Sequence, residues 1–377
     1  MAIYLDCNAS TPLEPGVLKV VTHYLANEVG NAGSRTHEFG ARAKAAVDEA
    51  REQVAAAVCA RPEEVVFTSG ATEANNLALL GLVAHGEARG KRHVVSTQIE
   101  HKAVLEPLRS LEARGFTVTL VRPTRAGWVD PVEVERALTP QTLLVSIMHV
   151  NNETGVVQPL TEIASRLADH PAYLHVDAAQ GLGKDVDALR NRRLDLISIS
   201  GHKIHAPQGI GALVARRRRF ERPPLAALQY GGGQERGLRA GTLPVALIAG
   251  LGEATKLAVK HHAKRREACL EIRRNALRAL AALDPHINGD PERCLPHVLN
   301  LSIPGLDSEA VMVALKGLVA ISNGSACTSS SYQPSHVLQA MGIPEEQIQG
   351  AIRLSWCHLT EPPDWEKVVA TLKRLRP

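Results

Sequence analysis

The feature that most limits how this chain can fold is a repeated alternation of short apolar runs with longer segments of helical periodicity. Apolar runs at residues 64–68, 93–97, 143–149, 174–177 and 196–200 each end in polar residues. Continuous apolar runs are typical of strands buried on both faces, and strands that alternate with helices form parallel sheets. The sequence therefore predicts an α/β fold in which helices cover a mostly parallel sheet.

Helical periodicity fills the intervals between these strands, and the interval between Asp177 and Lys203 leaves room for a helix and a second strand. Further strands are expected at 3–5, 117–121 and 211–215. After residue 283, strands expected at 298–302, 319–322 and 351–355 mix with helices at 308–315, 334–341 and 365–374. The helices expected earlier in the chain are 16–26, 41–59, 74–85, 104–114, 131–138, 160–169 and a long one at 247–283.

A chain of 377 residues, 45% hydrophobic, is long enough for two domains with a sizeable core. The long helix contains a charged patch at 260–267, and we place the change of domain there. We expect a large domain at 13–260 that carries the parallel sheet. Residues 1–12 and 261–377 would form a small α+β domain.

Charge and cysteine spacing exclude several classes of protein. The net charge of +4 is too small to favour nucleic acid, and the basic run 216–219 is expected to be a solvated loop or helix end. The sequence predicts no membrane span and no signal peptide. The six cysteines include no C-x-x-C pair, which argues against a zinc site and a disulfide framework and favours a reducing cytoplasm.

The strand at 196–200 leads into a polar turn that contains Ser200, His202 and Lys203. A lysine at the end of an apolar strand is desolvated, which lowers its pKa and makes it a nucleophile for carbonyl groups such as that of pyridoxal 5′-phosphate (PLP). Ser200 and His202 could reach a phosphate from the same turn. A solvated lysine at an ordinary strand exit explains this stretch equally well.

A second strand end, at Asp177, favours the cofactor. Asp177 could pair with a protonated pyridine nitrogen, and Gln180 follows close enough to approach the same ring. Asp177 and Lys203 would both lie at carboxyl ends of strands, where α/β sheets bind ligands. Taken alone, Asp177 is more simply a helix N-cap.

Two further stretches could hold a phosphate. A turn at 69–72 opens a helix, so its amide groups and the hydroxyls of Ser69 and Thr72 could form an anion cradle, although a plain N-cap is the alternative. The glycine-rich loop 231–242, with its two arginines and Thr242, could wrap a phosphate or be a surface loop.

One cysteine differs from the others in its surroundings. Cys327 lies among small polar residues at 322–331, as suits an exposed nucleophile that reaches a site and then presents itself elsewhere. Cys59 lies in an apolar run and is expected to be a buried structural residue. Cys7 lies in a polar loop, and Cys357 ends an apolar run beside His358.

Together these stretches resemble a known family. Thr68-Ser69-Gly70-Ala71-Thr72-Glu73, His149-Val150-Asn151-Asn152-Glu153, His175-Val176-Asp177-Ala178-Ala179-Gln180, Ser200-Gly201-His202-Lys203 and Gly324-Ser325-Ala326-Cys327-Thr328-Ser329 are similar, in that order, to motifs of the PLP-dependent cysteine desulfurases of the NifS/IscS type. The resemblance runs from about Tyr4 to the C-terminus. It implies the fold-type-I aminotransferase architecture, a homodimer, and the conversion of L-cysteine to L-alanine with the sulfur held as a persulfide.

The resemblance implies cofactor roles for the matching residues. Lys203 would form the Schiff base, Asp177 would pair with the pyridine nitrogen, and Gln180 would bond the phenolic oxygen. The phosphate would be held by the Ala71 backbone, Thr72, Ser200, His202 and, across the dimer, Thr242.

It also implies catalytic and substrate-binding roles. His101 would stack on the ring and move protons, and Asn152 would contact cofactor and substrate. Arg353 would bind the substrate carboxylate, and Cys327 would take the sulfur and pass it to an acceptor protein. Because Cys7 departs from many relatives, a second thiol is expected near the site.

The sequence as a whole resembles the branch of this family that serves DNA phosphorothioation. The chain ends soon after its last helix, whereas the IscS branch carries a longer tail that docks its iron–sulfur scaffold, so that partner is not expected. The alternatives are a sulfur donor for iron–sulfur clusters or tRNA thiolation, a selenocysteine lyase and an aminotransferase. A non-catalytic carrier of sulfur or metal on a degenerate PLP fold is a further alternative.

Overall fold

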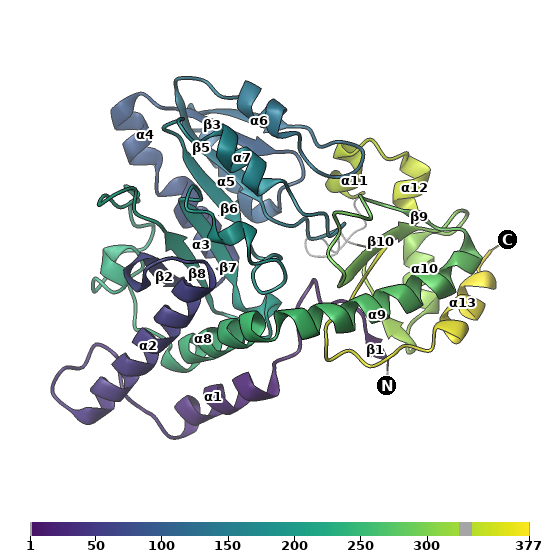
Figure 1. The fold of residues 1–377 in the computed structure, drawn as a ribbon, viewed down its shortest axis with the longest axis horizontal. Coiled ribbons are helices and arrows are strands. Elements are labelled where there is room, and N and C mark those ends of the chain that lie inside the picture. The colour runs from purple at the N-terminus through teal and green to yellow at the C-terminus, as the bar shows by residue number, and fades with distance from the viewer. Residues whose placement is uncertain (1, 324–333, 377) are drawn as a thin grey trace.

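A computed structural model describes residues 2–323 and 334–376, which are built around a seven-stranded sheet (Figure 1). Neighbouring strands are parallel except for β8, which is antiparallel to both β2 and β7. The mostly parallel α/β sheet that the sequence predicts is therefore confirmed. In spatial order the strands are β2 (Val65–Thr68), β8 (Gly211–Ala215), β7 (Leu196–Ser200), β6 (Tyr173–Asp177), β5 (Thr142–Met148), β3 (His93–Thr97) and β4 (Thr117–Val121).

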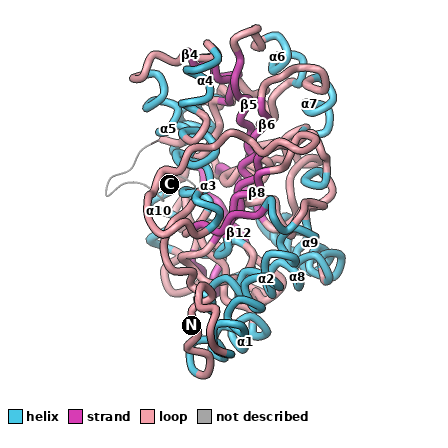
Figure 2. The backbone as a smooth tube through the Cα atoms, turned by 90° about the vertical axis from the view of Figure 1, so that its left-hand side faces the viewer, coloured by secondary structure: helices cyan, strands magenta, loops and turns pink. Residues whose placement is uncertain are grey.

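Helices cover both faces of this sheet (Figure 2). Because side chains alternate along a strand, Val65 and Phe67 pack into one hydrophobic core and Val66 into the other. The first core is closed by α1 (Pro15–Ala26), α2 (Glu38–Ala57), α6 (Pro131–Arg136), α7 (Leu160–Arg166) and α8 (Val245–Lys260). The second is closed by α3 (Ala71–Leu80), α4 (Val83–Arg89) and α5 (Lys102–Glu112).

A second, smaller sheet belongs to the C-terminal part of the chain, and α9 (His262–Leu280) runs from α8 toward it (Figure 1). This sheet is antiparallel, in the order β12 (Ala351–Ser355), β10 (Val298–Ser302), β9 (His286–Ile287). Its core also contains Leu5 from the N-terminus. The hydrophobic core of the smaller sheet is separate from the cores of the large sheet, which supports the prediction of two domains. The residue boundaries of the two domains stay a prediction. The remaining elements are β1 (Ile3–Tyr4), β11 (Val319–Ala320), α10 (Ser308–Ala314), α11 (His336–Ala340), α12 (Glu345–Gln349) and α13 (Trp365–Lys373).

Two helix predictions were wrong, and one interval that has room for an α-helix contains none. The helix expected at 74–85 is two helices, α3 and α4, and it starts earlier, at Ala71. The helix expected at 247–283 breaks between α8 and α9 at His261, whose φ of −105° and ψ of 13° leave the helical range. The segment between β6 and β7 contains a 3₁₀ turn, Ala188–Arg190, and no α-helix. Gly183, with φ of +75°, turns the backbone there in a way that a helix cannot accommodate.

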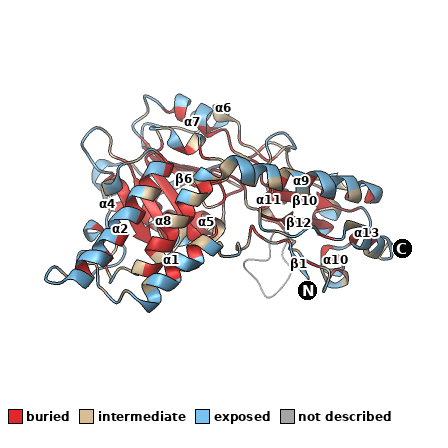
Figure 3. Ribbon diagram, turned by 60° about the horizontal axis from the view of Figure 1, so that its bottom comes forward, coloured by how far each residue is buried: buried red, intermediate tan, exposed pale blue. Residues whose placement is uncertain are grey.

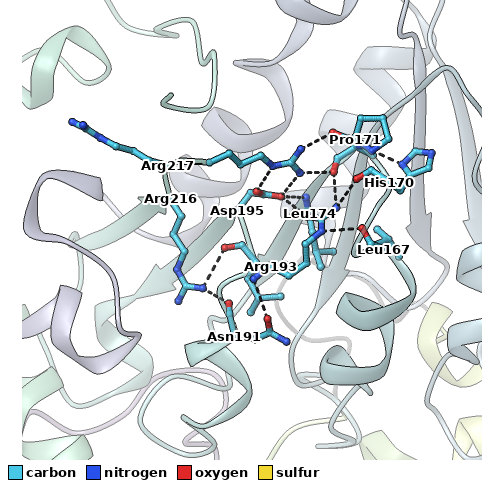
Figure 4. Close-up of polar contacts among 12 residues, drawn as sticks. Leu167, His170, Pro171, Leu174, Asn191, Arg193, Asp195, Arg216 and Arg217 are labelled. Atoms are coloured by element: carbon cyan, nitrogen blue, oxygen red, sulfur yellow. Dashed lines mark hydrogen bonds and ion pairs between the residues drawn. The ribbon is translucent and has the colours of Figure 1, made fainter. Parts of the chain in front are cut away.

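The basic run 216–219 after β8 was predicted to be a solvated loop or helix end, but only part of it is exposed (Figure 4). Arg216 is buried and donates to backbone carbonyls, including that of Leu189 at 2.7 Å. Arg218 and Arg193 each donate to the Asp195 carboxylate at 2.7 Å. The same carboxylate also accepts from the Leu174 amide. These arginines tie together the amino ends of β6 and β7, opposite the edge where those strands end.

The outer faces of α1, α2 and α8 are exposed and their inner faces are buried (Figure 3). Within the described ranges, every helix is too short or too polar to cross a membrane. Cys59 is exposed, so its prediction as a buried residue was wrong. The apolar run ends there in a turn, with Cys59 itself at φ of +55°.

Candidate active site

A cavity of about 530 Å³ lies where β5, β6 and β7 end, and most of the predicted site residues line it. Their positions follow from the sheet, because parallel strands bring their carboxyl ends to one edge. Thr242 is exposed and does not line this cavity, and Cys327 lies outside the described residues. The predicted residues that the cavity brings together are Ala71, Thr72, His101, Asn152, Asp177, Gln180, Ser200, His202, Lys203 and Arg353.

Lys203 ends the 3₁₀ turn that follows β7. Its Nζ donates to the carbonyl oxygen of Ala9 at 2.8 Å and to that of Asn8. The turn requires glycine at 201, because a Cβ there would lie 2.8 Å from the Ile210 carbonyl oxygen. Tight packing thus holds the amine of Lys203 at the edge of the sheet, against the N-terminal segment.

Asp177 ends β6 and is 6% exposed. Its Oδ2 accepts from Asn75 Nδ2 at 2.8 Å, and its Oδ1 accepts from the Ala179 amide at 3.0 Å. No α-helix follows Asp177 in the described chain before β7, so it is not the helix N-cap that was its alternative. The sequence reasoning missed Asn75; an amide among the apolar residues of α3 was the available signal.

The Gln180 side chain is held at both ends. Its Nε2 donates to the Asn8 carbonyl oxygen at 2.9 Å, and its Oε1 accepts from Lys184 Nζ at 3.1 Å. Burial, reinforced by the nearby charge of Lys203, lowers the pKa of Lys184 to about 8. Lys184 therefore fixes the orientation of the Gln180 amide, a role that the sequence did not indicate.

His101 caps α5 and presents a neutral imidazole to the cavity. Its Nδ1 accepts from the Ala103 amide at 3.1 Å, so the proton of the neutral ring is on Nε2. Burial lowers the pKa of His101 below its ordinary value. The preceding residue, Glu100, is fully buried, and that burial raises its pKa to about 8.

Arg353 reaches the cavity from β12 of the smaller sheet and is 1% exposed. Its Nη2 donates to Asp6 Oδ1 at 2.6 Å, and its Nη1 donates to the Asn152 carbonyl oxygen at 3.0 Å. The two sheets therefore meet at this guanidinium, which can offer a fork of N–H groups to a carboxylate.

The residues present fit PLP. Among the described residues, no side chain caps the first turn of the ten-residue α3, so its amide groups are placed to bind a phosphate beside Thr72. Gly70 lies so close to Gly211 that a Cβ at 211 would be 2.6 Å from the Gly70 Cα. Burial lowers the pKa of His202 to about 4, so it is a neutral donor beside Ser200. Asp177 and Lys203 then suit the ring nitrogen and the aldehyde.

Comparison with known proteins gives similarities that extend over nearly the whole chain. The family model for aminotransferase class-V matches residues 3–368. A cysteine desulfurase of Pongo abelii is 44% identical over 382 residues, which cover 99% of this chain and 82% of that protein. The structure of DndA from Streptomyces lividans is 51% identical, covering 93% of this chain and 98% of that one, with a TM-score of 0.83. The structure of SspA in complex with cysteine is 37% identical, covering 96% and 99%, with a TM-score of 0.83.

Proposed function

Since this chain belongs to the aminotransferase class-V family and is a PLP-dependent cysteine desulfurase, we propose that it converts L-cysteine to L-alanine and carries the sulfur as a Cys327 persulfide. The observation that carries this proposal is the single cavity that joins Lys203, Asp177, His101 and Arg353. The similarity to SspA, whose structure contains cysteine, supports L-cysteine as the substrate.

PLP supplies an electron sink for the substrate carbons when it is bound. Lys203 would hold the cofactor aldehyde, and its free amine would move the proton at the substrate Cα. Asp177, held by Asn75 at 2.8 Å, would keep the pyridine nitrogen protonated. Gln180 would donate to the phenolic oxygen. These four side chains therefore orient the cofactor and control its charge.

Four residues act on the substrate directly. Arg353 binds the substrate carboxylate, and Asn152, whose carbonyl oxygen accepts from it at 3.0 Å, contacts cofactor and substrate. His101 stacks on the ring and transfers a proton at the substrate sulfur. The Cβ–S bond breaks as the Cys327 S–S bond forms, and the proton of the Cys327 thiol is transferred to Cβ, so that the products are alanine and a persulfide.

The phosphate would be held by the Ala71 amide, Thr72, Ser200 and His202. Thr242 is exposed and does not line the cavity, which supports its role as a contact from the partner subunit of a homodimer. Sedimentation of the PLP-loaded protein would give the mass of a dimer, and a monomer that binds PLP equally well would contradict this assignment.

The experiment is incubation of the PLP-loaded protein with L-cysteine. With a thiol reductant we expect equal amounts of alanine and sulfide. Without it, mass spectrometry should show one additional sulfur atom on the Cys327 peptide. Cys59→Ser, which removes an exposed thiol elsewhere, is the matched control for Cys327→Ser and should behave like the parent.

Several results would contradict the proposal. A persulfide mainly on Cys7 or Cys357, or sulfide release by Cys327→Ser at the parental rate, would remove the role of Cys327. A 2-oxo acid in place of alanine would indicate an aminotransferase. Release of selenium from selenocysteine without release of sulfur from cysteine would indicate a selenocysteine lyase.

The destination of the sulfur is proposed to be an acceptor protein in the DNA phosphorothioation system, in the cytoplasm. The 51% identity to DndA and the free state of the described cysteines support this. Replacing the gene by its Cys327→Ala form should abolish phosphorothioate linkages in hydrolysed DNA, measured by mass spectrometry. Intact linkages with reduced iron–sulfur enzyme activity or tRNA thiolation would favour those alternatives.

A further inference from the structure

A second cavity, of about 50 Å³, shares Lys203 with the first and has a different lining. Cys7, His205, Cys357 and His358 line it, and none of them has a part in the chemistry above. They come from the segments that follow β1, β7 and β12. These two imidazoles and two thiols thus converge directly beside the cofactor lysine, and Cys269, His262 and His297 also line the cavity.

Three of these side chains are close enough to share one ion. One potential ligand atom each from His205, Cys357 and His358 lies within 4.8 Å of the other two, the one such set among residues 2–323 and 334–376. The two imidazole rings are perpendicular, with centroids 4.9 Å apart. His205 has a φ of +70°, an uncommon conformation for a residue other than glycine, and such strain is often found at functional sites.

Each imidazole has one nitrogen directed at a backbone or carboxylate oxygen. Nδ1 of His205 lies 2.9 Å from the Pro12 carbonyl oxygen, to which it can only donate, so Nε2 carries the lone pair. Nε2 of His358 lies 3.4 Å from Glu14 Oε2 and makes no hydrogen bond among the described residues, while Arg265 holds that carboxylate at 2.6 Å. An acceptor behind one ring nitrogen, as at His205, is the usual arrangement of metal-binding histidines.

The two sulfurs of this group are in contact with each other. The Cys7 thiol donates to the Cys357 sulfur, and Thr360 Oγ1 donates to the same sulfur at 3.7 Å. Both thiols and both imidazoles are therefore ligand groups that face one small cavity.

Cations also face this cavity, and they limit which ions can bind. Lys184, Lys203, Arg265 and Arg266 line it, and Glu14 is the carboxylate that pairs with Arg265. A divalent ion beside these charges needs two thiolates to neutralise it. Zinc prefers such a set of two sulfur and two nitrogen ligands in a tetrahedron.

We propose that Cys7, His205, Cys357 and His358 form a zinc-binding site. On binding, the Cys7 and Cys357 thiols lose their protons to solvent, and both sulfurs and both imidazoles bond the ion. Ligand atoms of a zinc tetrahedron are about 3.3–3.8 Å apart, so the three clustered groups close in by about 1 Å. Cys7, which contacts Cys357 but lies outside the set of three, must also approach the imidazoles. Cysteine spacing did not predict this site because its ligands come from three distant segments.

The test is zinc binding by the full-length, PLP-loaded Cys327→Ser protein, in which the catalytic thiol cannot act as a ligand. The protein is reduced, freed of metal and titrated with zinc chloride against a chromogenic chelator. We expect one zinc ion per chain. X-ray absorption should show two sulfur atoms at about 2.3 Å and two nitrogen atoms at about 2.0 Å.

Variants identify the ligands. Cys357→Ser and His358→Ala should each weaken zinc binding by at least a hundredfold, with cofactor absorbance and circular dichroism as checks on folding. His205→Asn, which tolerates the same backbone conformation, should do the same. Cys59→Ser and His23→Ala, which alter a thiol and an imidazole elsewhere, should bind zinc like the parent.

The proposal is overturned if no zinc binds at micromolar concentration. It is equally overturned if X-ray absorption shows no sulfur ligand, or if the ligand variants that keep their cofactor bind zinc as tightly as the controls.

Discussion

Glu100 should make this protein less stable as the pH rises. The side chain is fully buried between β3 and β5. Its Oε1 accepts from Thr97 Oγ1 at 2.7 Å and from the Met148 amide at 2.9 Å, and its Oε2 has no hydrogen-bond partner within residues 2–323 and 334–376. Burial is the largest cause that raises the pKa of Glu100, to about 8 in the folded protein.

The sign follows from proton linkage. An unfolded glutamate has a pKa of about 4.3. Between about pH 4.3 and 8 the folded chain therefore binds the proton that the unfolded chain has lost, and the free energy of unfolding falls as pH rises. At about 1.36 kcal/mol per pKa unit, the loss from pH 5.5 to 7.5 is about 2.5 kcal/mol.

Glu100→Gln removes this titration. The amide oxygen can still accept both hydrogen bonds, and the amide NH₂ that replaces Oε2 adds a cost of about 1–3 kcal/mol at every pH. The free energy of unfolding of the variant minus that of the parent should therefore increase by about 2.5 kcal/mol from pH 5.5 to 7.5.

The assay is urea unfolding followed by tryptophan fluorescence at the two pH values. Glu106→Gln, which alters an exposed carboxylate on α5, is the control and should show no such change. A difference between Glu100→Gln and parent that is the same at both pH values would refute the reasoning, whatever its size.

Three further predictions concern the cavity. Lys203→Ala should lose turnover, and borohydride reduction should no longer attach the cofactor to the peptide that contains residue 203; attachment at that position in the parent is the control, and attachment at another lysine contradicts the assignment. His101→Asn can still cap α5, so its melting temperature should be nearly unchanged while turnover falls by roughly 10²–10⁴; parental turnover would exclude proton transfer by His101. Arg353→Lys cannot offer a planar fork, so its KM for L-cysteine should rise by roughly tenfold or more; an unchanged KM would place the carboxylate elsewhere.

The strands were well predicted from sequence because each is a short apolar run with polar ends. Strands β3, β4, β8, β10 and β12 have the predicted bounds. The approximate positions of the helices were predicted correctly, but their first and last residues were not. The end of a helix depends on capping residues and on local breaks in the helix. The spacing of apolar residues in the sequence reveals neither the break at His261 nor the start of α3 at Ala71.

The motifs of the cavity could also be located from sequence. Lys203, Asp177 and His101 follow strand ends, and parallel strands carry such residues to a common edge. The residues that hold them could not be predicted. Asn75 on α3 and Lys184 after β6 act through single hydrogen bonds to Asp177 and Gln180, and no spacing rule links those positions.

The sequence by itself determined the α/β class, the main strands and the motifs of a PLP enzyme, because these depend on local periodicity and on residue types at strand ends. The tertiary structure decided what meets across the chain. Asp6 meets Arg353 only because the N-terminal segment pairs with β12. Cys7, His205 and Cys357 converge for the same reason. Contacts between segments hundreds of residues apart depend on how the two sheets pack, and local sequence contains no signal of that packing.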